Sequence, residues 1–226
     1  MQRTSQTFKI HNIDLFKEQL LLWAQQFNKI VWLDSNNYSQ KHSSFDAVLA
    51  VDSFSEIETN YTNAFQQLKN YQTEVQDYIF GYLGFDLKND VEKLTSNNID
   101  ELHFPDLFFF QPKKIFLLKG TSIEVKYISE LENEIKTDFE NIYATTNNQL
   151  QKTNTKVKIK LRIHKEEYFQ KIQTILNHIH RGNIYEVNFC QEFYSENSII
   201  NPIDIYKNLN KISKPPFATF LKHNDT

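Results

Sequence analysis

The chain has 226 residues, of which 40% are hydrophobic and 14% aromatic, and its formal net charge is -3. This composition is too apolar for a disordered chain, because burying so much hydrophobic surface can offset the entropy that is lost on ordering. The small negative charge does not provide the concentrated basic surface of nucleic-acid binders, so we expect no nucleic-acid partner.

No segment has the composition of a targeting or membrane-spanning sequence. The N-terminus lacks the apolar run of a signal peptide. The most apolar region, 104–118, is interrupted by prolines and charged residues and falls short of the roughly 18 apolar residues of a membrane span. The single cysteine, Cys190, excludes an internal disulfide, and we expect its thiol to be packed. We therefore expect a cytoplasmic protein with no membrane contact.

The first part of the chain alternates helical and strand patterns. Apolar residues at helical spacing predict helices at 14–27 and 62–72. Residues 29–33 form a short strand pattern, and the continuous apolar run 47–51 predicts a strand buried on both faces.

A strand with two glycines is predicted at 78–87. Gly81 and Gly84 lie inside it, and glycine within a strand marks a bulge or a close approach to the backbone. Three hairpin-like strands follow at 108–110, 115–118 and 123–128, with turn residues at 111–114 and 119–121 between them.

A helix at 131–143 precedes the best linker candidate, 144–154, which is rich in Thr, Asn and Gln. We therefore expect an N-terminal region at 1–150 and a second domain at 151–226.

The second domain repeats the alternation of strands and helices. Gly182 is placed to end a strong helix at 165–180, and Asn201 is placed to begin another at 201–212. Strands are predicted at 157–163, 185–193 and 217–221. The whole pattern indicates an α+β fold, with antiparallel sheets flanked by helices.

Residue types and spacing alone assign no catalytic or metal-binding residue. The sequence has no HExxH, no paired cysteines, no calcium loop, no GxGxxG and no P-loop. The polar strand face of Glu186, Asn188 and Glu192 is more typical of a solvated surface than of a catalytic one.

Four segments, in order along the chain, resemble component I of anthranilate and p-aminobenzoate synthases, which are chorismate-binding enzymes. Residues 182–191 (GNIYEVNFCQ) resemble the family stretch "aGDIYQVNLsq", with Asn183 and Glu186 in place of the usual Asp and Gln. Residues 81–87 (GYLGFDL) are similar to "GYLGYDL", and 216–221 (PFATFL) are similar to "PFSAFL".

The fourth segment resembles the N-terminal amino-acid pocket of these subunits, which takes tryptophan. It comprises Leu33-Asp34-Ser35 followed by 43–46 (SSFD). The resemblance implies a pocket for tryptophan or another amino acid. His42 stands where an aromatic residue is common in the family. The pocket residues that the resemblance implies are Ser35, His42, Ser43, Ser44, Phe45, Pro216, Phe217 and Ala218.

The resemblance also implies what the whole enzyme does. Family members act on chorismate with Mg2+ and use ammonia from a glutamine amidotransferase partner. Their lysine nucleophile, acidic glutamate and magnesium carboxylates lie in or near motifs such as "SPERF" and "PIKGT", which do not occur here. We therefore expect the start of an incomplete two-sheet fold, with no catalytic residue and no metal ligand.

Several interpretations of the function remain open. The segment 81–87 followed by Lys88-Asn89-Asp90 favours the aminodeoxychorismate (p-aminobenzoate) branch, which serves folate synthesis. Anthranilate synthase component I shares most of these motifs. A non-catalytic module that binds an amino acid or a partner protein is a third hypothesis, and an unrelated globular protein is a fourth.

Overall fold

The computed structural model describes residues 1–38, 44–146 and 157–226. The chain forms two compact units, one of Met1–Leu150 with Tyr206–Thr226 and one of Gln151–Ile205. The larger unit therefore contains the C-terminal residues that the sequence pattern assigned to the second domain.

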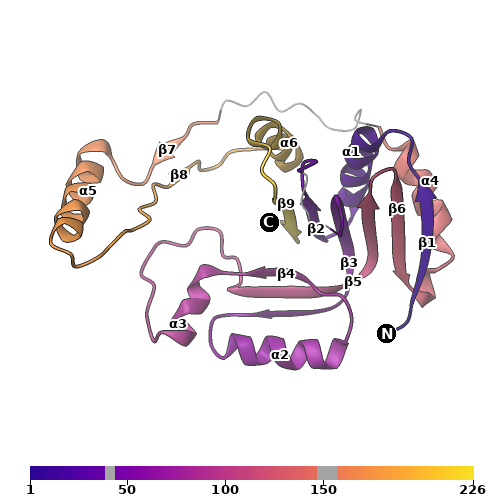
Figure 1. The fold of residues 1–226 in the computed structure, drawn as a ribbon, viewed down its shortest axis with the longest axis horizontal. Helices are drawn as coiled ribbons and strands as arrows, with labels where there is room; N and C mark the ends of the chain where they lie inside the picture. The colour runs from indigo at the N-terminus through magenta and orange to yellow at the C-terminus, as the bar shows by residue number, and fades with distance from the viewer. Residues whose placement is uncertain (39–43, 147–156) are drawn as a thin grey trace. The chain divides into compact units, whose positions relative to one another are not determined.

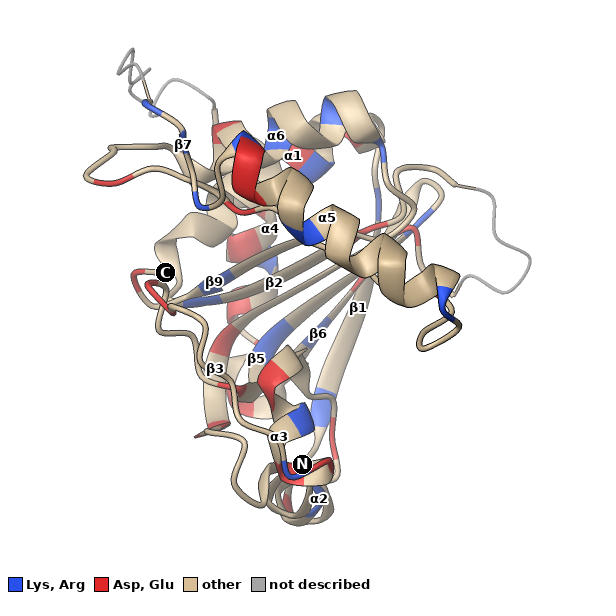
Figure 2. Ribbon diagram, turned by 90° about the vertical axis from the view of Figure 1, so that its left-hand side faces the viewer, with Lys and Arg blue, Asp and Glu red and all other residues tan. Residues whose placement is uncertain are grey.

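The larger unit is built on one antiparallel sheet. Its strands lie in the order β1 (Arg3–Lys9), β6 (Ser122–Ile128), β5 (Leu107–Lys119), β3 (Ala47–Thr59), β2 (Lys29–Asp34) and β9 (Ala218–His223) (Figures 1 and 2). A further short strand, β4 (Phe80–Leu83), pairs with β5. Together with the helices, this sheet confirms the predicted α+β class.

Two helices, α1 (Ile13–Trp23) and α4 (Glu134–Ala144), pack against one face of the sheet. Asn12 caps α1 by accepting a hydrogen bond from the Leu15 N–H at 3.1 Å. Aromatic rings fill the interface, with the centroids of Phe8 and Phe139 4.0 Å apart and those of Trp23 and Phe116 5.5 Å apart. A 3-10 turn, Ala24–Gln26, extends α1, and another, Ser129–Leu131, precedes α4.

The other face buries a second cluster. Val31, Ala50, Phe108 and Phe110 pack together with the half-buried Phe80. Helix α2 (Ala64–Val75) and the 3-10 turn Phe85–Leu87 pack instead on Leu107 and Phe109, which alternate along β5 with Phe108 and Phe110. The short helix α3 (Lys88–Val91) follows this turn.

The glycine expected to allow close backbone approach does so against β5. A Cβ built on Gly81 would lie 1.9 Å from the carbonyl oxygen of Phe108, which no side chain could tolerate. Strand packing inside the fold therefore explains why residue 81 is glycine, because Gly81 pairs directly with Phe109.

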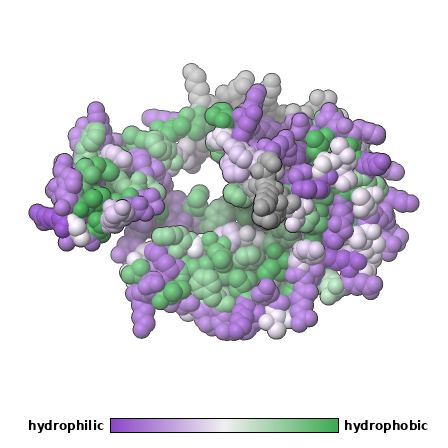
Figure 3. All heavy atoms as spheres, in the orientation of Figure 1, coloured by the Kyte–Doolittle hydropathy of each residue, from purple (hydrophilic) through white to green (hydrophobic). Residues whose placement is uncertain are grey.

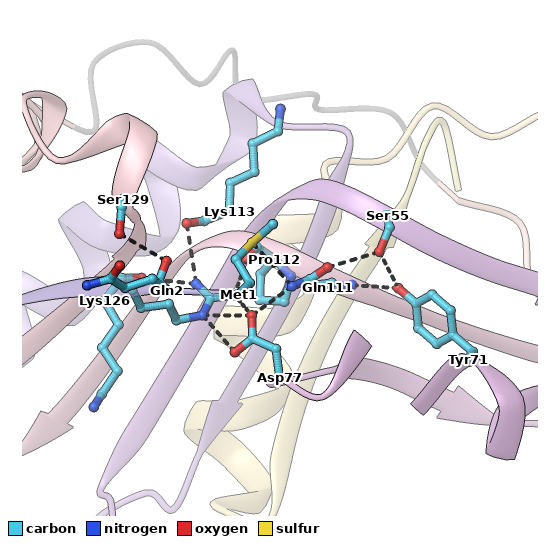
Figure 4. A network of polar contacts seen from close by, with 11 residues as sticks. Met1, Gln2, Ser55, Tyr71, Asp77, Gln111, Pro112, Lys113, Lys126 and Ser129 are labelled. Carbon is cyan, nitrogen blue, oxygen red and sulfur yellow. Dashed lines mark hydrogen bonds and ion pairs between the residues drawn. The ribbon is translucent and has the colours of Figure 1, made fainter. Parts of the chain in front are cut away.

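The turn predicted at 111–114 is wrong, because β5 runs straight through these residues. The register shifts opposite them on β3, beside Asp52, whose φ is 62°. Side chains form the hydrogen bonds that the backbone groups of these residues do not form with β3. Arg3 donates to the Pro112 carbonyl at 2.6 Å, and the Gln111 N–H donates to the Tyr71 hydroxyl at 3.1 Å (Figure 4). Proline and polar residues thus mark a bulge in a long strand pair.

The smaller unit is mostly irregular around helix α5 (Lys165–His180). Gly182 ends α5 as predicted, with φ 72° and the Asn183 N–H donating to the His178 carbonyl at 3.0 Å. The strands predicted at 157–163 and 185–193 are largely wrong, because only β7 (Lys160–Leu161) and β8 (Phe193–Tyr194) pair.

Side chains of the smaller unit are largely exposed in the part that the structure describes. No residue of α5 is buried, and Cys190 is exposed rather than packed. Hydrophobic side chains lie on the surface at α5 (Figure 3). Phe169 on this helix is 57% exposed. Residues 185–192, which belong to a predicted strand, do not lie in a strand in the structure.

Helix α6 (Pro202–Ser213) leads the chain into the final strand. Asn201 caps it, as predicted, by accepting from the Ile203 N–H at 3.1 Å. Strand β9 then pairs with β2 of the larger unit, although 217–221 were expected within the second domain. No helix among the described residues is long and apolar enough to cross a membrane.

Candidate functional site

Three strand ends meet at one edge of the large sheet. Asp34 ends β2, and it pairs with Ala47 at the start of β3 and with Ala218 at the start of β9. A cavity of about 310 Å3 opens there. Its volume is at the lower end of the range for small-molecule sites, about 300–1,000 Å3.

Most of the residues implied by resemblance line this cavity. Ser35, Ser44, Phe45, Pro216, Phe217 and Ala218 lie around it, although Phe45 and Phe217 are far apart in the sequence. His42 and Ser43 lie outside the described residues, so their part of the predicted pocket stays a prediction.

The cavity has a floor whose residues were not among the implied pocket residues. Leu33 pairs with Val48 on one side and with Thr219 on the other, and all three line the cavity. Residues paired across antiparallel strands project to the same face of the sheet. The strand register would therefore have predicted that these three side chains lie together. The sequence alone did not provide that register.

Few polar side chains face the cavity, and Ser35 is one of them. Its N–H donates to the Asp46 carbonyl at 2.9 Å, which fixes the turn out of β2. Its hydroxyl has no hydrogen-bond partner among the described residues. That hydroxyl can donate to or accept from a bound molecule.

Asp46 is held by groups from the neighbouring hairpin. Burial acts to raise the pKa of its carboxyl, but a hydrogen bond from the Gly120 N–H at 2.6 Å and the ammonium of Lys119 at 3.3 Å outweigh it. The pKa of Asp46 is therefore below its ordinary value, and the group is a carboxylate at neutral pH. It anchors the start of β3.

Asp34 is likewise engaged, on the side of the helices. Its Oδ1 accepts from the Lys17 ammonium at 2.9 Å and from the Asn36 N–H at 2.9 Å. Both partners of this ion pair are almost buried, with exposed side-chain fractions of 10% and 9%. Asp34 therefore holds the end of β2 against α1.

Aromatic rings form the walls. Phe217 is 77% exposed and Phe45 is 40% exposed, although both are large apolar side chains. A fold gains little from rings left in water, whereas a ligand between them would cover both.

The arrangement can bind a small molecule. Its lining combines apolar walls with a serine hydroxyl, and no group of His, Cys, Asp or Glu among the described residues could hold a metal ion. The described residues therefore provide no binding site for Mg2+.

Comparison with known proteins identifies the family. Residues 27–226 match the family described as chorismate binding enzyme, which is most of the chain. The chain belongs to the chorismate binding enzyme family.

Two curated relatives share limited identity with this member of the family. The chain is 23% identical over 167 residues to aminodeoxychorismate synthase component 1 of Bacillus subtilis (strain 168), covering 67% of this chain and 34% of that protein. It is 21% identical over 142 residues to an anthranilate synthase component I-like protein of Synechocystis sp., covering 62% of this chain and 29% of the other. The chain thus spans about a third of the length of the curated relatives it matches.

Among solved structures, the chain is similar to MenF, the menaquinone-specific isochorismate synthase from Escherichia coli. The identity is 13% and the TM-score 0.39, with 82% of this chain and 38% of that chain covered.

Proposed function

We propose that this chain is the N-terminal portion of an aminodeoxychorismate synthase component I. It would hold an L-amino acid at the ends of β2, β3 and β9. The complete enzyme would convert chorismate with ammonia to 4-amino-4-deoxychorismate, for p-aminobenzoate and folate synthesis. The observation that carries the proposal is the cavity lined by Phe45, Phe217 and Ser35, whose hydroxyl has no hydrogen-bond partner in the part of the chain that the structure describes.

Two further facts support the p-aminobenzoate branch. A relative that bears this name, from Bacillus subtilis, matches 67% of the chain. The sequence of 81–87, followed by Lys88-Asn89-Asp90, also resembles this branch.

The proposal includes partners and a cofactor. A glutamine amidotransferase subunit would supply ammonia, and chorismate would be the substrate of the complete enzyme. Mg2+ would be bound by carboxylates from outside these residues, since none of the described ones form a metal-binding group. The chain would work in the cytoplasm.

Anthranilate synthase component I is the second candidate. The relative from Synechocystis sp., whose name refers to that subunit, matches 62% of the chain at nearly the same identity. A non-catalytic binding module is the third candidate. Residues implied for binding line the first cavity, and no group of His, Cys, Asp or Glu among the described residues could hold a metal ion.

A calorimetric titration with a panel of L-amino acids, including tryptophan, tests the proposal. We expect one of them to bind saturably to the full chain. Phe217→Ala and Ser35→Ala should each weaken binding about tenfold or more, because they remove a wall and a polar contact.

Phe65→Ala is a matched control, because Phe65 is an exposed ring on α2, away from the cavity lining. It should bind like the wild type. No saturable binding by any amino acid, or equal loss in all three variants, would refute the amino-acid site.

A further inference from the structure

A second cavity, of about 660 Å3, lies on the other face of β2. Trp32 lines it, whereas its neighbour Leu33 lines the first cavity, and successive strand residues point to opposite faces. Its walls come from α1, from the turn after β2, and from the part of α6 that begins at Tyr206. Asp34, which belongs to one of the segments that resemble the family, also lines this cavity.

The walls are held rigidly where they meet. The side-chain amides of Asn36 and Asn210 exchange two hydrogen bonds of 2.7 Å, and Asn36 also donates to the Pro215 carbonyl at 2.6 Å. These contacts tie the turn after β2 to the end of α6, so the cavity keeps its shape without a ligand.

The charges around the cavity leave an excess of cations. Asp34 is neutralised by Lys17, and Glu18 forms an ion pair with Lys207. The ammonium groups of Lys211 and Lys214 have no partner in the part of the chain that the structure describes. Asp14, in the first turn of α1, is the one remaining acid of the lining.

A hydroxyl donor also faces the cavity. The Tyr206 hydroxyl accepts a hydrogen bond from the Trp32 indole N–H at 3.1 Å, and its own hydrogen has no acceptor among the described residues. Burial, together with the charge of Asp34, raises the pKa of Tyr206 to about 12. The phenol is therefore protonated at neutral pH and remains a donor.

Lysines at a helix C-terminus can be explained by the helix dipole alone. That explanation covers Lys211 but gives no reason for the unused phenol hydrogen of Tyr206 on the same cavity. Donors in excess of acceptors, around a preformed space, match the needs of an anion.

We propose that this cavity binds a small organic anion through a carboxylate or phosphate group. Lys211 and Lys214 would hold the charge, and the Tyr206 hydroxyl would donate to it. The site is separate from the proposed amino-acid cavity, and either could exist without the other.

The two tryptophans of the chain make the test direct. The indole N–H of Trp32 contacts Tyr206, whereas the Trp23 ring packs against Phe27 and Phe116. In 1H–15N spectra of the full chain, titration with inorganic phosphate, and separately with succinate, is carried out at constant ionic strength. We expect a saturable shift of the Trp32 indole with at least one anion, and no shift of the Trp23 indole.

Saturation with phosphate alone would identify a phosphate group as the ligand chemistry, and saturation with succinate alone a carboxylate. The double variant Lys211→Gln/Lys214→Gln should weaken the apparent affinity at least tenfold, and Lys69→Gln, an exposed lysine on α2, should leave it unchanged. The proposal is overturned if neither anion saturates, if both indoles shift together, or if the double variant titrates like the wild type.

Discussion

At the scale of single residues, two phenylalanines close in sequence have different tasks, Phe220 within β9 and Phe217 directly before it. Phe220 is 8% exposed and its ring lies 5.7 Å from that of Tyr206, whereas Phe217 is 77% exposed beside the first cavity. The first ring stabilises the fold, and the second is available to a ligand.

This difference in exposure predicts a large loss of stability for one substitution and a small change for the other. Phe220→Ala should lower the free energy of unfolding by about 3–5 kcal/mol, because it opens a void in the core. Phe217→Ala should change it by no more than about 0.5 kcal/mol, as for other surface substitutions. Urea denaturation of both variants measures this, and a large loss for Phe217→Ala would show that the ring is part of the core.

His223 links stability to pH. Its Nδ1 lies 3.2 Å from the Lys29 ammonium and its Nε2 lies 3.2 Å from a Glu58 carboxylate oxygen. Burial and the charge of Lys29 lower its pKa below the ordinary value, although Glu58 and Glu56 act to raise it. The folded protein therefore favours the neutral ring, accepting from Lys29 and donating to Glu58.

Because the pKa is lowered on folding, the unfolded chain binds a proton more readily than the folded chain. This contribution to stability is complete above the unfolded pKa of about 6.5 and is lost as pH falls through the folded pKa. We expect the wild type to lose stability between about pH 7 and pH 5 more steeply than His223→Gln, whose side chain does not titrate. Parallel pH profiles in urea denaturation would contradict this role of His223.

At the scale of elements, a buried polar network joins β1, β5 and the end of α2. Arg3 and Asp77 form an ion pair of 2.8 Å, with exposed side-chain fractions of 8% and 7% (Figure 4). Gln111 donates to Asp77 at 2.8 Å, and Arg3 reaches the Pro112 carbonyl. Burial acts to raise the pKa of Asp77, but Arg3 and Gln111 outweigh it, so the pKa is lowered.

Asp77→Ala should therefore be costly. It leaves the Arg3 guanidinium buried without its counter-ion, and we expect a loss of about 3 kcal/mol in the free energy of unfolding. Glu124→Ala breaks the more exposed ion pair between Glu124 and Lys126, which both lie on β6. It should lower the free energy of unfolding by no more than about 1 kcal/mol. Similar losses in urea denaturation would mean that burial does not distinguish these pairs.

The sequence predicted those elements that its local pattern specifies. The helix at 165–180 matches α5, with its glycine cap, because apolar spacing and capping residues act within one turn. The predicted turn at 111–114 failed, because the partners of Gln111 and Pro112 are Tyr71 and Arg3, which are distant in sequence. The same limit hid the cavity floor, since Val48 and Thr219 meet Leu33 only through strand register.

At the scale of the whole molecule, the two compact units differ in their cores. The larger unit contains the sheet and the buried side chains on its two faces, whereas α5 of the smaller unit has no buried residue. A helix of this length is marginal in water without tertiary packing. The motif at 182–191 thus lies in a segment that its own unit stabilises little.

Amide hydrogen exchange should separate the units. We expect amides of β9 to be protected as strongly as those of β2, because the two strands pair along their length. Amides of α5 should exchange orders of magnitude faster. Strong, uniform protection over 160–194 would show that the smaller unit has a self-sufficient core.

The most direct measurement of the central claim locates the amino acid itself. With the L-amino acid that binds in the titration, isotope-filtered NOE spectra detect its contacts with the rings of this chain. We predict NOEs from the bound amino acid to Phe45 and Phe217, which line the first cavity, and none to the buried Phe220. Binding with no NOE to Phe45 or Phe217 would contradict the account, since the amino acid would then lie elsewhere.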